Sequence, residues 1–103
     1  MSQLEFFCDA DGNPCARGTD RRLATFLQTD LQGSVEVTRD LATKLASDEK
    51  KIEFNGNGHS VAITTVMATI ESHFDDEAPD RRMTRAQLLT QVEAWLKFIS
   101  NPK

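Results

Sequence analysis

The sequence predicts an α+β fold in a single domain, residues 1–103, with an antiparallel β-sheet and helices packed on one face. Apolar residues alternate with period two near the N-terminus and again over residues 52–74, which is typical of half-buried strands. Between these runs and at the C-terminus, apolar residues recur at helical spacing. The expected order of elements is therefore strand, strand, helix, helix, strand, strand, strand, helix (ββααβββα).

A hairpin is expected at the N-terminus. Residues 4–8 and 15–17 are extended in character, and residues 9–14 between them, Asp-Ala-Asp-Gly-Asn-Pro, are a dense run of turn formers. Gly12 tolerates positive φ, and Pro14 is compatible with a position that needs no ladder donor.

Two helices are expected next. Thr19 or Asp20 is available as the first N-cap, Gly33 suits the end of that helix, and Ser34 can cap the second. Residues 35–37, Val-Glu-Val, are also compatible with a short strand, so the start of the second helix stays open.

Residues 52–74 contain a change of parity. Val61 and Ile63 stand at odd-numbered positions, whereas Val66, Ala68 and Ile70 stand at even-numbered ones, so one face of a single strand cannot hold them all. The chain must turn or bulge near residues 64–65, and a turn completes a three-stranded meander. The preceding Asn-Gly-Asn-Gly at 55–58 is interpreted as a hairpin turn, because a phosphate loop needs a following Lys-Ser/Thr and a helix.

The last helix is the clearest element. Thr84 and Gln87 match a capping box, and an apolar stripe runs from Leu88 to Ile99. Residues 75–82 before it are interpreted as a charged loop. The expected core consists of Leu4, Phe6, Leu23, Phe26, Leu27, Leu41, Leu45, Phe54, Ile63, Ile70, Leu88, Val92, Trp95 and Ile99.

Composition narrows the class of function. The net charge of −4, from 12 basic and 16 acidic residues, argues against a general nucleic-acid binder. No apolar run is long enough for a membrane span and the N-terminus lacks a signal pattern, so we expect a cytoplasmic protein with Cys8 and Cys15 as free thiols.

No motif predicts catalytic, cofactor-binding or metal-binding residues. Residues 9–20 resemble a calcium loop, but Pro14 stands where the pattern requires glycine. Cys8, Cys15, His59 and His73 lack zinc-site spacing, and no nucleophile elbow occurs. We expect His59 to be exposed beside its turn and His73 to point away from the core.

The best candidates for partner binding lie near the C-terminus. Asp75, Asp76 and Glu77 form an acidic cluster suited to a basic partner. Phe98 lies roughly 80° from the centre of its helix's apolar stripe, where it either anchors an interface or packs on a neighbouring strand. These features predict a non-catalytic protein-interaction factor of adaptor, inhibitor or immunity type, possible as a homodimer.

Two alternatives belong to other classes. One is an enzyme or small-ligand binder, metal-dependent or not, that uses Cys8, His59 or His73. The other is nucleic-acid binding through the dibasic pairs Arg21-Arg22, Lys50-Lys51 and Arg81-Arg82, each of which has acidic neighbours.

Several segments together carry a family resemblance: Leu-Glu-Phe-Phe at 4–7 with its Asp-x-x-Gly turn, Gly58-His59 opening a strand, and Val-Glu-Ala-Trp-Leu-Lys-Phe-Ile at 92–99. In these the chain resembles the small uncharacterised bacterial proteins of the YacL type. It differs from them in a shorter turn around Thr64, a shorter acidic segment and the absence of tyrosine. That family has no assigned activity, so the resemblance implies a bacterial origin and no site residues.

Overall fold

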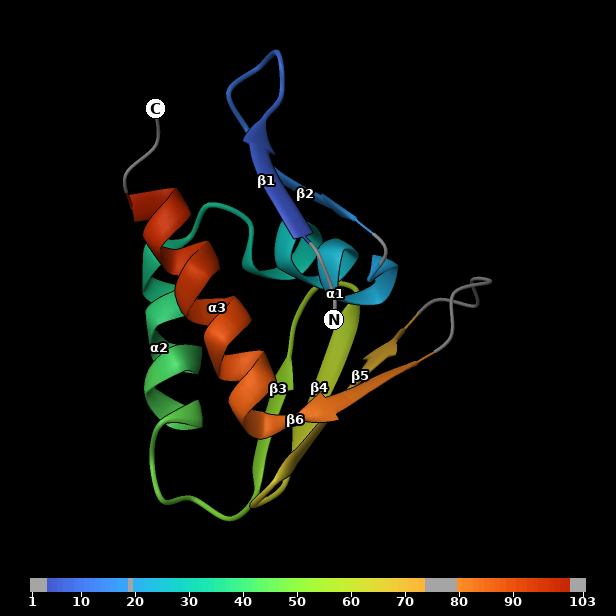
Figure 1. Ribbon diagram of the computed structural model, residues 1–103, viewed down its shortest axis with the longest axis vertical. Coiled ribbons are helices and arrows are strands. Elements are labelled where there is room, and N and C mark those ends of the chain that lie inside the picture. Colours follow the sequence, from blue (N-terminus) through green and yellow to red (C-terminus); the bar gives the residue numbers. More distant parts are fainter. Residues whose placement is uncertain (1–3, 19, 74–79, 101–103) are drawn as a thin grey trace.

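The computed structural model describes residues 4–18, 20–73 and 80–100, and it confirms the α+β class with antiparallel sheets. The elements form two layers: helices α2 (Val35–Leu45) and α3 (Arg85–Ser100) lie side by side against a sheet, and an N-terminal hairpin lies above them in the view of Figure 1. In chain order the elements are β1 Leu4–Cys8, β2 Pro14–Gly18, α1 Arg21–Phe26, the π-helix η1 Leu27–Leu31, α2 Val35–Leu45, β3 Ile52–Asn55, β4 His59–Ile63, β5 Met67–Ser72, β6 Arg81–Thr84 and α3 Arg85–Ser100.

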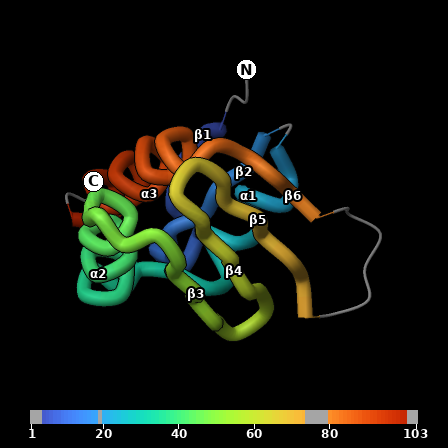
Figure 2. The backbone as a smooth tube through the Cα atoms, turned by 90° about the horizontal axis from the view of Figure 1, so that it is seen from below, coloured from blue at the N-terminus to red at the C-terminus, as the bar shows by residue number. Residues whose placement is uncertain are grey.

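The strands form two separate sheets. The β1–β2 hairpin stands alone, with Phe6 opposite Ala16, and β3, β4, β5 and β6 form a meander in chain order (Figure 2). The expected turn at residues 64–65 is confirmed, because β4 ends at Ile63 and the Thr64 amide donates to the Met67 carbonyl at 2.8 Å. The meander has one strand more than the sequence predicts, since Arg81 and Arg82 belong to β6 and pair with β5 rather than to a loop.

The first helical segment changes type halfway. The Asp20 side chain caps α1 by accepting from the Leu23 amide, and after six residues the chain continues as η1. Gln32 ends η1 with φ of 51°, a positive value that residues other than glycine seldom adopt and that the sequence does not signal. Ser34 then caps α2, so residues 35–37 are helical and the strand alternative is wrong. On α2 the apolar Val37 is exposed, whereas Thr38, one position later, is buried.

The core lies between the helices and the inner face of the four-stranded sheet. Eleven of the fourteen expected core residues are buried, and Leu4, Phe6 and Phe54 are half-buried against them. The buried residues that the prediction omits are mostly small or placed on β4 and β6: Ala16, Ala24, Leu31, Ala42, Ile52, Val61, Ala68 and Met83.

The N-terminal hairpin is held to α3 by aromatic packing. The Phe6 ring meets Trp95 edge-on, with 5.1 Å between centroids, and lies 5.7 Å from Phe98. Trp95 is fully buried, and its indole nitrogen donates to the Gln32 carbonyl at 2.8 Å. Through this one side chain, α3 contacts both the hairpin and the end of η1.

Arg85 connects the start of α3 to the C-terminal end of α2 and the β4–β5 turn, at the end of the fold away from the N-terminal hairpin. Its side chain is buried, and each of its five N–H groups donates to a backbone carbonyl, those of Lys44, Leu45, Ser47, Glu49 and Thr64. Three of these carbonyls belong to the C-terminal end of α2 and its continuation, where the helix dipole favours a cation. The expected Thr84–Gln87 capping box forms at the start of α3, and both of its reciprocal hydrogen bonds measure 3.0 Å.

Within residues 4–18, 20–73 and 80–100, no helix has the length and apolar character needed to cross a membrane.

We expect Arg85→Lys to lower the free energy of unfolding by about 2 kcal/mol and Arg85→Ala by about 3 kcal/mol or more, because buried carbonyls lose their donors. Urea denaturation followed by circular dichroism measures both values. Arg39→Ala, at an exposed position of α2, is the matched control and should change stability by less than about 0.5 kcal/mol. A loss at Arg85 no larger than at Arg39 would show that these bonds add nothing.

Candidate functional site

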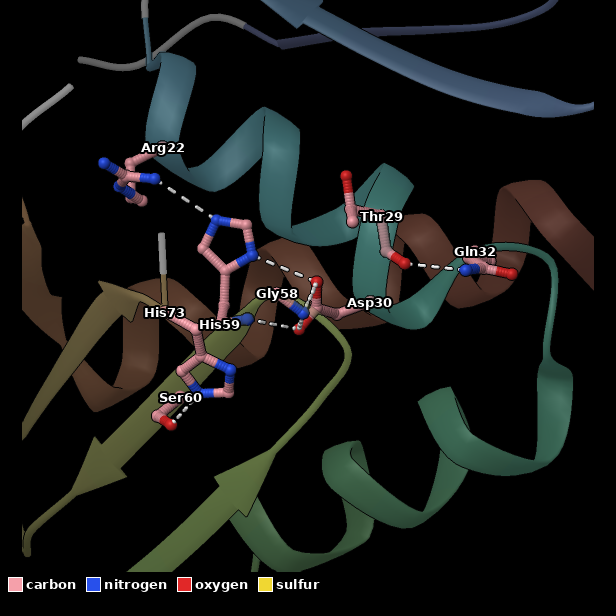
Figure 3. Close-up of polar contacts among 8 residues, drawn as sticks. All are labelled: Arg22, Thr29, Asp30, Gln32, Gly58, His59, Ser60 and His73. Atoms are coloured by element: carbon pink, nitrogen blue, oxygen red, sulfur yellow. Dashed lines mark hydrogen bonds and ion pairs between the residues drawn. The ribbon is translucent and has the colours of Figure 1, made fainter. Parts of the chain in front are cut away.

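His59 lies inside the protein, so the expectation that it is exposed is wrong. Only 3% of the residue is accessible, and its ring packs edge-on against Phe26. The reason is parity: His59 is the first residue of β4 and shares the inner face with Val61 and Ile63. Its proximity to a glycine-rich turn, which suggested exposure, is offset by η1 covering that turn (Figure 3).

The Asp30 carboxylate binds the β3–β4 turn and explains the burial of His59. It accepts from the amides of Gly58, at 3.2 and 3.3 Å, and His59, at 2.9 Å, and contacts His59 Nδ1 at 3.0 Å. The turn approaches so closely that a Cβ on Gly56 would overlap this carboxylate. The Asn-Gly-Asn-Gly run is thus a hairpin turn, as expected, and its amides enclose an anion supplied by the chain itself.

The proton positions in this buried cluster follow from its partners. Arg22 Nη1 lies 3.3 Å from His59 Nε2 and can only donate, so Nε2 accepts. Nδ1 therefore carries the ring proton and donates to Asp30. Both ring nitrogens of His59 are therefore hydrogen-bonded, one to the Asp30 carboxylate and the other to the Arg22 guanidinium. Because only 3% of His59 is accessible, a substrate cannot reach the ring. This arrangement is suited to holding η1, α1 and the meander together.

The opposite face of the same strands carries a second polar cluster. The Ser60 hydroxyl donates to Asn55 Oδ1 at 2.9 Å and therefore accepts from His73 Nε2. His73 is exposed and points away from the core, as expected. A nucleophilic serine must give its proton to the histidine, whereas Ser60 receives one from His73, so this pair lacks the arrangement of an activated nucleophile.

These residues belong to a larger surface. One side of the meander carries no helix of the described chain (Figures 1 and 2). The alternating burial along all four strands indicates that their exposed side chains lie on this side. We call this surface the open face and define it by Glu53, Asn55, Ser60, Ala62, Thr69, Glu71 and Arg82. Strand pairing sets them in rows: Asn55, Ser60 and Glu71 in one, and Glu53, Ala62, Thr69 and Arg82 in the next.

The two cysteines do not converge with each other or with the histidines. Cys8 pairs with Pro14, so Cys15, the next residue along, projects from the other side of the hairpin, and both thiols are free. Desolvation raises the pKa of Cys15, and the charge of Asp9 raises it further. Asp9 itself accepts from the amides of Asp11 and Asn13, and donation from the Asn13 backbone lowers its pKa.

The dibasic pairs are divided between interior and surface. Arg22 is buried beside His59, and Arg81 binds the buried carboxylate of Asp20 at 2.9 Å. Arg21, Arg82 and the two lysines at 50 and 51 are exposed. One arginine of each arginine pair, Arg22 and Arg81, therefore makes a contact within the protein.

The proposed partner-binding residues fall partly outside the structure's described range. Asp75, Asp76 and Glu77 lie in residues 74–79 and so outside it. Phe98 is half-buried and lies within 6 Å of the rings of both Phe6 and Trp95, at 5.7 and 5.8 Å between centroids. Its packing on β1 is the second of the two alternatives that the sequence left open.

The sequence does not predict Asp30, Arg22 or Arg85 as key residues. A polar residue within an apolar helical repeat is the one available signal: Asp30 interrupts the run that ends at Leu31, and Arg22 precedes Leu23. Nothing in that signal names their partners, which are 28 or more positions away in the chain.

No protein-family profile, curated protein sequence or solved structure matches this chain.

We expect Gly56→Ala to destabilise the protein by about 2–4 kcal/mol, because the added methyl displaces the Asp30 carboxylate from its donors. Thermal and urea unfolding give the value. Gly33→Ala is the matched control, since a Cβ there meets only Pro14, at 3.5 Å and beyond. Equal stability of the two variants would mean that the carboxylate is not held as described.

Alkylation of Cys15 should have its pH midpoint above that of an ordinary thiol, since a raised pKa leaves less thiolate at a given pH. Asp9→Asn should lower that midpoint by removing the neighbouring charge. Iodoacetamide rates measured by peptide mass spectrometry across pH test this, with Asp11→Asn in the same turn as control. An unchanged midpoint in Asp9→Asn contradicts the assigned cause.

Proposed function

We propose that this protein acts by binding another protein rather than by catalysis, as an adaptor, inhibitor or immunity-like factor. The open face is the observation that supports this proposal best. All four strands contribute exposed or half-buried polar and small side chains to it, on one continuous side of the sheet.

The arrangement of the reactive side chains agrees with a binding role. Cys8 lies at the end of β1, His59 is buried between Asp30 and Arg22, and His73 donates to Ser60 on the outer side of the meander. The enzyme alternative requires at least two of these three side chains to share a pocket, and they lie on three different parts of the fold.

The charge of the chain favours a partner with basic residues. Among the residues that the structure describes, two arginines and two aspartates are buried, Arg22, Arg85, Asp20 and Asp30, and their charges cancel, so their burial does not change the sign of the net charge of −4. Glu71 and Asp80 are exposed on either side of the acidic cluster at 75–77. Opposite charge steers association and selects among partners more than it sets affinity.

Site-specific photocrosslinking tests the proposal. A benzophenone amino acid at Ala62 or Glu71, both exposed on the open face, should give adducts with a different protein in cells of the source organism. The same probe at Thr43, exposed on α2, should not. Excess unlabelled wild-type protein should compete for the adduct, and the Glu71→Arg variant should compete less well.

Adducts of equal yield from all three positions, or none with any other protein, would argue against the proposed function.

A further inference from the structure

Two of the three charged residues that define the open face, Glu53 and Arg82, lie at its two edges, and the third, Glu71, lies on β5 in the neighbouring row. Glu53 lies on β3 and Arg82 on β6, in one row with Ala62 and Thr69 between them. Three inter-strand spacings separate the two, about 14 Å, so they do not pair within one molecule. The row runs from a negative edge to a positive edge across two small side chains.

This order is complementary to itself. A two-fold axis parallel to the strands, between β4 and β5, places β3 of one copy over β6 of another and keeps each row over its own equivalent. Glu53 then faces Arg82 of the second copy, and Ala62 faces Thr69. Because the contact is isologous, both pairs form twice.

The shape of the face permits this contact. The centre of this row is small, with Ala62 and Thr69 side by side, so along it two sheets can approach to the roughly 10 Å of packed sheets, and in the neighbouring row the same axis sets Glu71 opposite Ser60 of the second copy. An aligned packing rotates one sheet by about 30°, which displaces each edge residue by about 4 Å. Glutamate and arginine side chains are long enough to span that displacement.

We propose that the open face binds the same face of a second copy of this chain, with Glu53 of each facing Arg82 of the other. The footprint is on the order of 400 Å² per copy, below the roughly 800 Å² of a stable interface, so the dimer is weak and concentration-dependent. The proposal rests on the proposed function in that both use the open face, and a dimer covers this face until another protein displaces one copy.

Charge reversal with rescue tests the dimer. Sedimentation equilibrium from micromolar to millimolar protein should show a monomer–dimer equilibrium for wild type. Glu53→Arg or Arg82→Glu alone should raise the dimer dissociation constant at least tenfold, since each places like charges together twice, and the double variant should restore it. Rescue cannot come from within one copy, because the two residues lie at opposite edges of the sheet.

Glu93→Arg, the same charge change at an exposed position of α3, is the control and should leave the dissociation constant unchanged. Circular dichroism of each variant confirms that it folds. A monomer at every concentration, or a dimer that neither single reversal weakens, overturns the proposal. A monomeric protein that still gives crosslinks to a different protein from Ala62 refutes the dimer and leaves the proposed function standing.

Discussion

The contact between Asp30 and the β3–β4 turn is the constraint on which the rest of the fold depends. A carboxylate with no accessible surface needs donors within reach, and here they come from the Gly58 and His59 amides and the His59 ring. That requirement fixes η1 over the end of the meander, brings Phe26 against His59, and leaves no room for a side chain at residue 56. The position of α1, including Arg22, follows from the same contact.

Polar side chains with several donors or acceptors connect the layers, and apolar side chains fill the space between them. Arg85 joins α3 to α2 and the β4–β5 turn, Trp95 joins α3 to Gln32, and Gln28 accepts from the Ala16 amide in the hairpin. Apolar contacts are non-directional, whereas each of these bonds has one geometry. In a chain of this size, such bonds specify how the elements are oriented.

The sequence predicts the elements better than the contacts between them. Periodicity and capping residues locate the hairpin, both long helices and the turn at residue 64, because these are set by neighbours in the chain. The strand β6 escapes prediction because its four residues, Arg81–Thr84, include two arginines and one apolar residue, and only pairing with β5 makes them extended. His59 and Asp30 are misjudged or missed for the same reason, since their environment comes from residues far away in sequence. The open face is implied by alternation, but its charge order requires the strand register.

The packing of Phe6 on Trp95 has a consequence for the order of events during synthesis. The meander joins strands that are consecutive in the chain, so its pairings are local and form early. The N-terminal hairpin is synthesised well before its aromatic partners Trp95 and Phe98, which lie about 90 positions later in the sequence. The hairpin is therefore among the last elements of this domain to dock, and until α3 has been made Phe6 remains without these partners and accessible to chaperones.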